Sequence, residues 1–102
     1  MRLYADLHIH TNLSDSTYSP AEVVKLSLKN GLSCISITDH DTIDGILPAL
    51  KEAKNSALEI IPGIEMTCEL DNLEIHILGY FVDYKNESFL KELIKLRKFR
   101  VE

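Results

Sequence analysis

The chain has 102 residues and a formal net charge of −5, and 45% of its residues are hydrophobic. This composition excludes a disordered chain, leaves no room for a second domain, and does not favour nonspecific binding to a nucleic-acid backbone, which depends on clustered Lys and Arg. No window approaches the ~20 apolar residues of a membrane span and no apolar signal-peptide core follows Arg2, so we expect a cytoplasmic protein without a membrane partner.

The first part of the chain predicts a strand, a helix and a second strand. Alternating side chains predict a strand over residues 2–9, which leads into a polar loop. A helix is expected next, because Ser19 can cap it, Glu22 can close a capping box and Asn30-Gly31 supplies a left-handed stop. Residues 32–38 are apolar and rich in β-branched side chains, which is typical of a strand buried on both faces.

The middle of the chain predicts a second helix, a third strand and a hairpin. Helical spacing of apolar residues starts at Ile43, and Pro48 is expected to split or restart that helix. A third strand over residues 58–61 is followed by a Pro-Gly pair, and residues 66–70 and 72–81 are predicted to form a hairpin. The alternation of strands and helices predicts an α/β fold of right-handed parallel βαβ units with helices packed outside.

The end of the chain is predicted to be a basic helix over residues 86–102, which no glycine, proline or cap ends. Residues 85–102 carry a net charge of +3, whereas residues 1–84 carry −8. An acidic body suits the binding of cations. Because the helix runs to the last residue, we expect a truncated chain.

Cys34 and Cys68 form no C-x-x-C pair, so we expect free, mostly buried thiols.

Four histidines lie at or just after predicted strands. His8 and His10 are two residues apart on a strand, so their imidazoles share a face and could hold one ion, although strand histidines are commonly surface residues without a partner. His40 follows the most apolar strand, at the edge where parallel α/β folds build sites, and a metal ligand is the preferred interpretation there. For the neighbouring Asp41 and Thr42, capping of the next helix is preferred.

Three further residues extend this pattern. Glu65 follows a Pro-Gly turn that could aim its side chain into a site, and His76 lies opposite the apolar face of the hairpin, where it faces either a site or water. Asp15 lies in the first loop, where turn formation is the alternative role. Imidazoles and carboxylates at several strand ends favour Zn, Mn or Fe, and such clusters activate water and neutralise phosphate oxygens. The pattern therefore predicts hydrolysis of phosphate esters.

Six short segments are spread across residues 1–84: DLHIHT at 6–11, SD at 14–15, SP at 19–20, ITDHDT at 37–42, GIE at 63–65 and EIHILGY at 74–80. In type and order they resemble the polymerase and histidinol phosphatase (PHP) family of metal-dependent phosphoesterases. The resemblance implies the first half of a distorted (β/α)7 TIM-like barrel, with up to three divalent ions at the carboxyl ends of its strands. Residues 1–84 would be the N-terminal part of the PHP domain, and residues 85–102 a helix leading to a missing subdomain or barrel half.

The resemblance also implies ligands for each ion: His8, His10 and Glu65 for the first, Asp15 and His40 for the second, and Glu65 with His76 for the third. Each ion would gain one more ligand from the later half of the barrel, which this chain lacks. In the nucleotide-directed branch of the family, the helix after the hairpin provides arginines for substrate phosphate. Arg97 and Arg100 lie three apart on one helix face and are the candidates here, the alternative being an ordinary solvated face.

The function implied by this resemblance is that of a phosphatase or phosphodiesterase acting on a nucleotide or small phosphate ester. The alternatives are a histidinol-phosphatase-like enzyme, an enzyme acting on DNA ends, and a metal-binding or oligomerising half-barrel without turnover. A half-barrel exposes sheet edges and apolar faces, so a homo-oligomer that completes the barrel is an expected partner.

Overall fold

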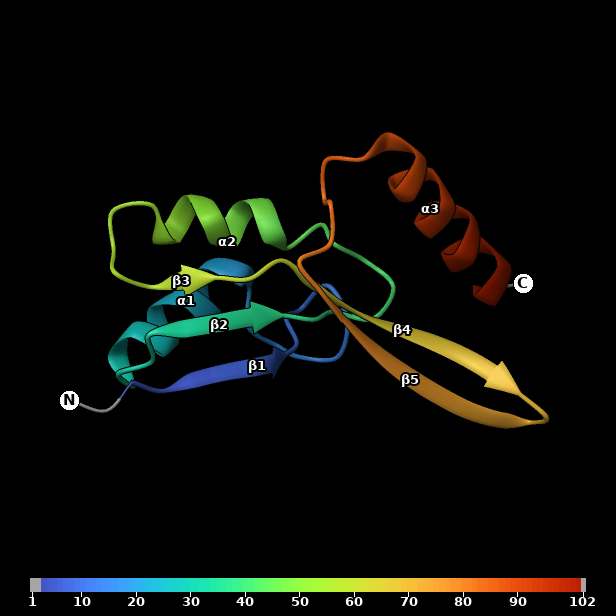
Figure 1. The fold of residues 1–102 in the computed structure, drawn as a ribbon, viewed down its shortest axis with the longest axis horizontal. Helices are drawn as coiled ribbons and strands as arrows, with labels where there is room; N and C mark the ends of the chain where they lie inside the picture. The colour runs from blue at the N-terminus through green and yellow to red at the C-terminus, as the bar shows by residue number, and fades with distance from the viewer. Residues whose placement is uncertain (1–2, 102) are drawn as a thin grey trace.

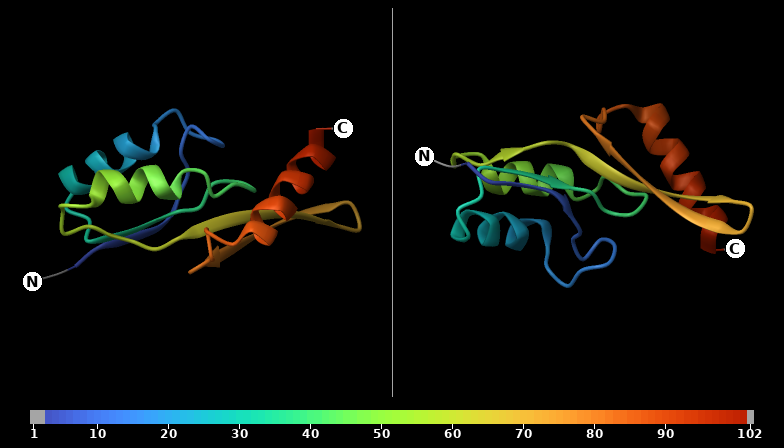
Figure 2. Two further views of the ribbon diagram at one scale, coloured as in Figure 1. Left: turned by 90° about the horizontal axis from the view of Figure 1, so that it is seen from above. Right: turned by 60° about the horizontal axis from the view of Figure 1, so that its bottom comes forward.

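The computed structural model describes residues 3–101, with side chains through residue 98. It has an α/β architecture: two helices cover a three-stranded parallel sheet, and a two-stranded antiparallel hairpin extends from the sheet and carries a third helix (Figures 1 and 2). The molecule is elongated, with principal extents of 46 × 27 × 24 Å, because the hairpin projects beyond the sheet. None of the described helices is long and apolar enough to cross a membrane.

The parallel sheet has the order β1 (Ala5–Ile9), β2 (Cys34–Ile37) and β3 (Glu59–Ile60). The central strand β2 pairs in parallel with both neighbours, as the predicted alternation of strands and helices requires. The helices α1 (Pro20–Lys29) and α2 (Ile46–Ala53) connect these strands and lie beside each other against the sheet (Figure 2). A single apolar core joins sheet and helices, formed by Val23, Val24, Ile35, Ile37, Ala49, Ala53 and Leu58.

The start of α1 confirms the predicted capping box. The Ser19 hydroxyl accepts a hydrogen bond from the Glu22 backbone N–H, and the Glu22 carboxylate accepts one from the Ser19 N–H, both at 3.1 Å. These contacts with Ser19 lower the pKa of the Glu22 carboxyl, because they stabilise its ionised form. The chain therefore enters α1 with two of its free backbone donors satisfied.

The start of α2 differs from the prediction in two ways. Pro48 does not split the helix, because α2 begins only at Ile46 and Pro48 lies in the first turn, where a backbone N–H has no acceptor within the helix. Capping by Asp41 or Thr42 is also wrong, since the residue at the N-cap is Gly45 and no side chain bonds there. The Thr42 hydroxyl instead accepts a hydrogen bond from the Asp44 N–H at 3.2 Å.

The predicted hairpin is formed by β4 (Gly63–Leu70) and β5 (Leu73–Tyr80), which pair over their whole length. Asp71 and Asn72 form the turn with φ of 50° and 68°, the pair of positive values that a tight hairpin turn requires. The first strand of the hairpin, β4, starts at Gly63, three residues before the predicted start at residue 66.

The early start of β4 has a steric reason at Gly63. A Cβ on Gly63 would overlap the Ser36 hydroxyl oxygen and lie 2.9 Å from Thr38 Cγ2, so only glycine allows β4 to pass this close to β2. The glycine therefore marks a close approach of two backbones in addition to the bend after Pro62. As a consequence Glu65 lies within β4 and pairs across an isolated parallel bridge with His40.

The last helix, α3 (Glu87–Val101), packs against the hairpin and the start of α2. A second apolar cluster made of Ile43, Ile46, Ile64 and Leu93 holds these parts together. Both cysteines are free, as predicted. Cys34 is half-buried, and burial raises the pKa of its thiol, but Cys68 is exposed, so the prediction of mostly buried thiols is wrong for Cys68.

Candidate metal centre

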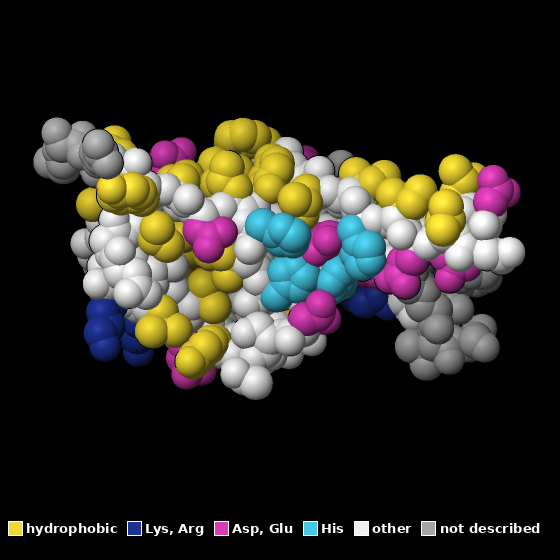
Figure 3. All heavy atoms as spheres, turned by 90° about the horizontal axis from the view of Figure 1, so that it is seen from below, with side chains coloured by type: hydrophobic (Ala, Val, Ile, Leu, Met, Phe, Trp, Pro, Cys, Tyr) yellow, Lys and Arg dark blue, Asp and Glu magenta, His cyan; other side chains and the backbone are white. Residues whose placement is uncertain are grey.

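The four histidines gather on one surface of the molecule around an acidic side chain (Figure 3). His8 belongs to β1 and His10 follows it, on the opposite side of the strand from Ile9, which packs into the core. His40 comes directly after β2, and His76 reaches the same place from β5. The end of the parallel sheet and the face of the hairpin thus build the site together.

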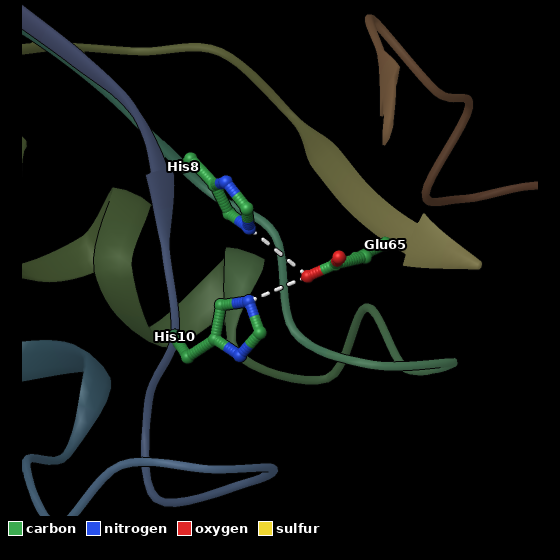
Figure 4. A group of neighbouring side chains, drawn as sticks. All are labelled: His8, His10 and Glu65. Carbon is green, nitrogen blue, oxygen red and sulfur yellow. Dashed lines mark hydrogen bonds and ion pairs between the residues drawn. The ribbon is translucent and has the colours of Figure 1, made fainter. Parts of the chain in front are cut away.

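Glu65 is the centre of this cluster. Its Oε1 lies 3.0 Å from His8 Nε2 and 2.7 Å from His10 Nε2 (Figure 4). Its other oxygen, Oε2, lies 3.2 Å from His76 Nδ1. The Glu65 side chain is only 8% exposed, so the histidines surround a nearly buried carboxylate that can face two ions at once.

Asp15 is the second carboxylate of the site. Its Oδ2 lies 2.9 Å from His40 Nε2 and 3.4 Å from His10 Nδ1. His10 stands between the two carboxylates, because one of its ring nitrogens faces Glu65 and the other faces Asp15. His40 Nε2 also lies 3.7 Å from Glu65 Oε1. The loop after β1 thus brings its acid to the same cluster as the strand residues.

The six predicted ligands form three groups, each with ligand atoms within 4.8 Å of one another: His8, His10 and Glu65; His10, Asp15 and His40; His40, Glu65 and His76. Atoms that share a tetrahedral ion at about 2.1 Å lie about 3.4 Å apart. The nitrogen–oxygen separations of 2.7 to 3.7 Å bracket that spacing. Imidazole and carboxylate donors without thiolates suit Zn, Mn or Fe, so these residues fit divalent ions. The groups contain every set that the family resemblance implied, and they add His10 to the second and His40 to the third.

The protonation state of Glu65 favours the binding of a cation. Burial alone would raise the pKa of its carboxyl, but the hydrogen bonds from His8 and His10 and the nearby charge of His40 outweigh burial. The pKa of Glu65 therefore lies below its usual value, and the side chain is an ionised acceptor at neutral pH.

Asp39 organises the loop that carries Asp15. It is 1% exposed, and its carboxylate accepts hydrogen bonds from the Thr11 N–H and hydroxyl, both at 2.6 Å, and from the Ser14 hydroxyl at 2.7 Å. A buried carboxylate needs such partners, and here they fix the loop between β1 and α1. Asp39 was not singled out as a site residue from the sequence. Its place directly after a buried strand, beside a histidine, was the signal that could have identified it.

Asp41 joins the site to the hairpin and to α3. It adopts a positive φ of 55°, its N–H donates to the Glu65 carbonyl at 3.0 Å, and its carboxylate accepts a hydrogen bond from the Thr67 N–H at 3.1 Å. The carbonyl of Asp41 accepts a hydrogen bond from Arg97 Nη1 at 2.8 Å. Arg97, one of the two predicted phosphate-binding residues, therefore contacts the backbone beside the site. The side chain of the other, Arg100, lies outside the described residues.

Two residues beside the histidines were not singled out as site residues from the sequence. The Thr67 hydroxyl lies 3.3 Å from His40 Nδ1, which leaves the other ring nitrogen directed at Asp15 and Glu65. Glu74 Oε1 lies 3.0 Å from His76 Nε2. Both residues share a hairpin face with Glu65, and strand alternation from Glu65 was the signal that could have found them.

An open groove of about 1040 Å³ borders the cluster between the first loop, the hairpin and α3. Its described lining residues are Leu13, Ser14, Asp15, His40, Asp41, Thr67, Cys68, Glu69, Glu74, His76 and Leu96. Acidic and imidazole side chains dominate this wall, and none of these lining residues is Lys or Arg. Its electrostatic character therefore favours cations over free anions.

Comparison with known proteins agrees with this geometry. The chain is 41% identical to the 5'-3' exoribonuclease Rnm of Escherichia coli, with 95% of this chain and 35% of that protein aligned. It is 27% identical to the 3',5'-nucleoside bisphosphate phosphatase of Chromobacterium violaceum, over 95% of this chain and 34% of that protein. The chain spans about a third of the length of these relatives.

A solved structure from Bifidobacterium adolescentis, provisionally described as a metal-dependent phosphoesterase, superimposes with a TM-score of 0.85 at 31% identity. The overlap covers 95% of this chain and 34% of the other. The sequence profile of the PHP domain matches residues 6–99, which include every predicted metal ligand. The chain belongs to the PHP domain family.

Proposed function

We propose that this chain provides the metal-binding part of a phosphoesterase that hydrolyses a nucleotide or another small phosphate ester. The observation that carries the proposal is the convergence of six imidazole and carboxylate side chains, with the nearly buried Glu65 at their centre. The E. coli relative is named for action on RNA and the C. violaceum relative for action on a nucleoside bisphosphate, which supports nucleotides over histidinol phosphate.

The proposed cofactors are up to three divalent ions, drawn from Zn, Mn and Fe, held by His8, His10, Asp15, His40, Glu65 and His76. When bound, such ions activate water and neutralise the charge of phosphate oxygens. Glu65 stays ionised at neutral pH because surrounding imidazoles stabilise its charge, so it is ready to bridge neighbouring ions. Asp39 holds the loop of Asp15 in place, and Thr67 holds one nitrogen of His40 away from the site.

Substrate phosphate is proposed to contact Arg97 and Arg100. Arg97 uses one N–H for the Asp41 carbonyl, and a guanidinium has five N–H donors in all, so further donors remain available for a phosphate. Asp41 lines the groove beside the cluster, which puts this guanidinium next to the place where an ester would lie.

The test is the metal content and hydrolytic activity of the purified protein. We expect about two or three ions per chain by elemental mass spectrometry, after reconstitution with Zn or Mn. Glu65→Gln should lose most of this metal, because Glu65 belongs to two of the three groups. Glu59→Gln makes the same change at an exposed residue of β3 and is the matched control.

Hydrolysis is then assayed with a nucleoside bisphosphate, a 5'-phosphorylated RNA and histidinol phosphate. Activity toward either nucleotide substrate that Glu65→Gln abolishes and Glu59→Gln keeps supports the proposal. Faster turnover of histidinol phosphate would contradict the substrate class. Bound metal without any turnover would instead support a metal-binding module that does not catalyse.

We also propose that copies of the chain associate. β1 is an edge strand of the parallel sheet, and Leu3, Tyr4 and Leu7 are exposed on it or just before it, so this edge and its apolar surface can contact a strand of another copy. Light scattering on the purified protein should show a mass above that of one chain, and a monomer at high concentration would contradict this association.

The free cysteines suit a reducing compartment, and the cytoplasm is the proposed location.

A further inference from the structure

Glu74 is an acidic residue of β5 that faces the metal centre without belonging to any of its three ligand groups. Its side chain is 62% exposed, and its Oε1 lies 3.0 Å from His76 Nε2. The opposite ring nitrogen, His76 Nδ1, lies 3.2 Å from Glu65 Oε2. The His76 ring is therefore held between one exposed and one nearly buried carboxylate.

This arrangement determines which nitrogen of His76 can act as a ligand. A neutral imidazole carries one N–H and one lone pair, and a ligating nitrogen must present the lone pair. Both flanking groups are carboxylates, but only Glu65 belongs to a ligand group with His76, so an ion shared by these two residues would take Nδ1 and leave Nε2 with the proton that it donates to Glu74. The lone pair then lies on Nδ1, on the side of Glu65.

The position of Glu74 in the hairpin is locally unfavourable, which suggests a role beyond the fold. Glu74 lies directly opposite Glu69 in the antiparallel pair, and like charges in that position destabilise a sheet. Both side chains line the groove. Only Glu74 of the two has an ion-pair contact with His76 among the described residues. Glu69 therefore carries the same charge and the same cross-strand repulsion without the contact.

We propose that Glu74 is a positioning residue that holds His76 with Nδ1 directed toward Glu65, and therefore toward the ion that these two residues would share. The inference rests on the proposed function, since it assigns Glu74 a role at the same metal centre. Carboxylates that accept the free N–H of a ligating histidine orient the ring and typically change metal affinity 10- to 100-fold, on the order of the effect expected here.

The first test measures the His76 ring itself in the Zn-loaded protein. Ring ¹⁵N chemical shifts distinguish a metal-bound imidazole nitrogen from one that carries a proton, so they show which nitrogen is the ligand. We expect Nδ1 to bind the ion and Nε2 to carry the proton in the wild type and in Glu74→Gln, whose amide oxygen can still accept the bond. We expect a mixture of Nδ1-bound and Nε2-bound forms in Glu74→Ala. The control Glu69→Ala should match the wild type, and an unchanged ring in Glu74→Ala would overturn the proposal.

The second test measures Zn and Mn affinity of the same variants by calorimetry. Glu74→Ala should bind one ion about tenfold more weakly than Glu69→Ala, although both lose one negative charge from the same hairpin face. Glu74→Gln should lie close to Glu69→Ala, because it keeps the acceptor. Equal affinities for the two alanine variants would overturn the role of Glu74. Absence of binding in the wild type would instead contradict the proposed function, and with it the role of Glu74 at that site.

Discussion

The parallel sheet with its two helices and the hairpin with α3 are stabilised in different ways. The first region has an apolar core of seven buried residues between sheet and helices, whereas a cluster of four buried residues holds the second region to it. The outer part of the hairpin exposes large apolar side chains, such as Leu70 and Leu73.

The metal centre takes residues from both regions. His8, His10, Asp15 and His40 come from the first, and Glu65 and His76 from the second. Folding therefore depends mainly on the first region, whereas completion of the site depends on how the hairpin is placed against it. Substitutions in one region or at the contact between them should separate these two properties.

The largest effect is expected from Ile35→Ala. Ile35 is fully buried at the centre of β2, between the helices and the sheet. Removing its side chain should lower the free energy of unfolding by about 4 kcal/mol, through lost burial and the cavity left behind. Urea denaturation followed by circular dichroism measures this loss. Ile77→Ala, at an exposed position of β5, is the control, and an equal loss there would contradict the difference between the two regions.

A slightly smaller loss is expected from Asp39→Ala. The substitution leaves the Thr11 N–H and two hydroxyl groups without their acceptor in a buried place, which should cost about 3 kcal/mol. It should also release the loop of Asp15, so that metal affinity falls together with stability. Asp44→Ala removes an exposed acid from the loop between β2 and α2 and should change neither stability nor metal affinity. Unchanged protection of the Thr11 amide from hydrogen exchange would contradict the role of Asp39.

The contact between the regions is tested by Gly63→Ala. The new methyl group would overlap the Ser36 hydroxyl, so β4 must move away from β2, at a cost of about 2 kcal/mol. The shift should carry Glu65 and His76 away from the other histidines and weaken metal binding more than stability alone explains. Gly79→Ala, on β5, meets its nearest atom at 3.5 Å, an ordinary contact, and should be tolerated. Equal metal affinity in both variants would mean that the approach at Gly63 does not position the site.

The features that could be predicted from the sequence are those with local causes. The capping box of α1 and the hairpin turn at residues 71–72 depend on side chains within three positions of one another. The clustering of His8, His10 and His40 was also predictable, because the carboxyl ends of neighbouring parallel strands meet at one edge.

The features that the sequence did not reveal depend on partners that are distant along the chain. Asp39 accepts hydrogen bonds from residues more than twenty positions away, and Thr67 contacts His40 across a similar separation. At position 63 only glycine avoids a clash with Ser36 of β2 and with Thr38 just after it. From the sequence alone, this glycine could be assigned only to the turn after Pro62. Each assignment needs the relative placement of two elements, which no local pattern contains.

The smallest effect is expected at the start of α1, inside the first region and away from the metal ligands. Ser19→Ala removes the hydroxyl that accepts the Glu22 N–H and should lower the free energy of unfolding by about 1 kcal/mol, with metal affinity unchanged. Contacts with Ser19, chiefly the hydrogen bond that its backbone N–H donates, lower the pKa of the folded Glu22 carboxyl, so its ionised form stabilises the native state above the pKa of the unfolded chain. This contribution is lost as the pH falls through the lowered pKa.

The difference in unfolding free energy between wild type and Glu22→Gln should therefore shrink in acid. Glu22→Gln can keep the hydrogen bond to the Ser19 N–H but cannot titrate, so its stability should lack this part of the pH dependence. Denaturation curves at several pH values measure both effects. A difference in unfolding free energy that stays constant in acid would show that the ionised Glu22 does not contribute to the cap. Lost metal binding in Ser19→Ala would show that the two regions are coupled through α1.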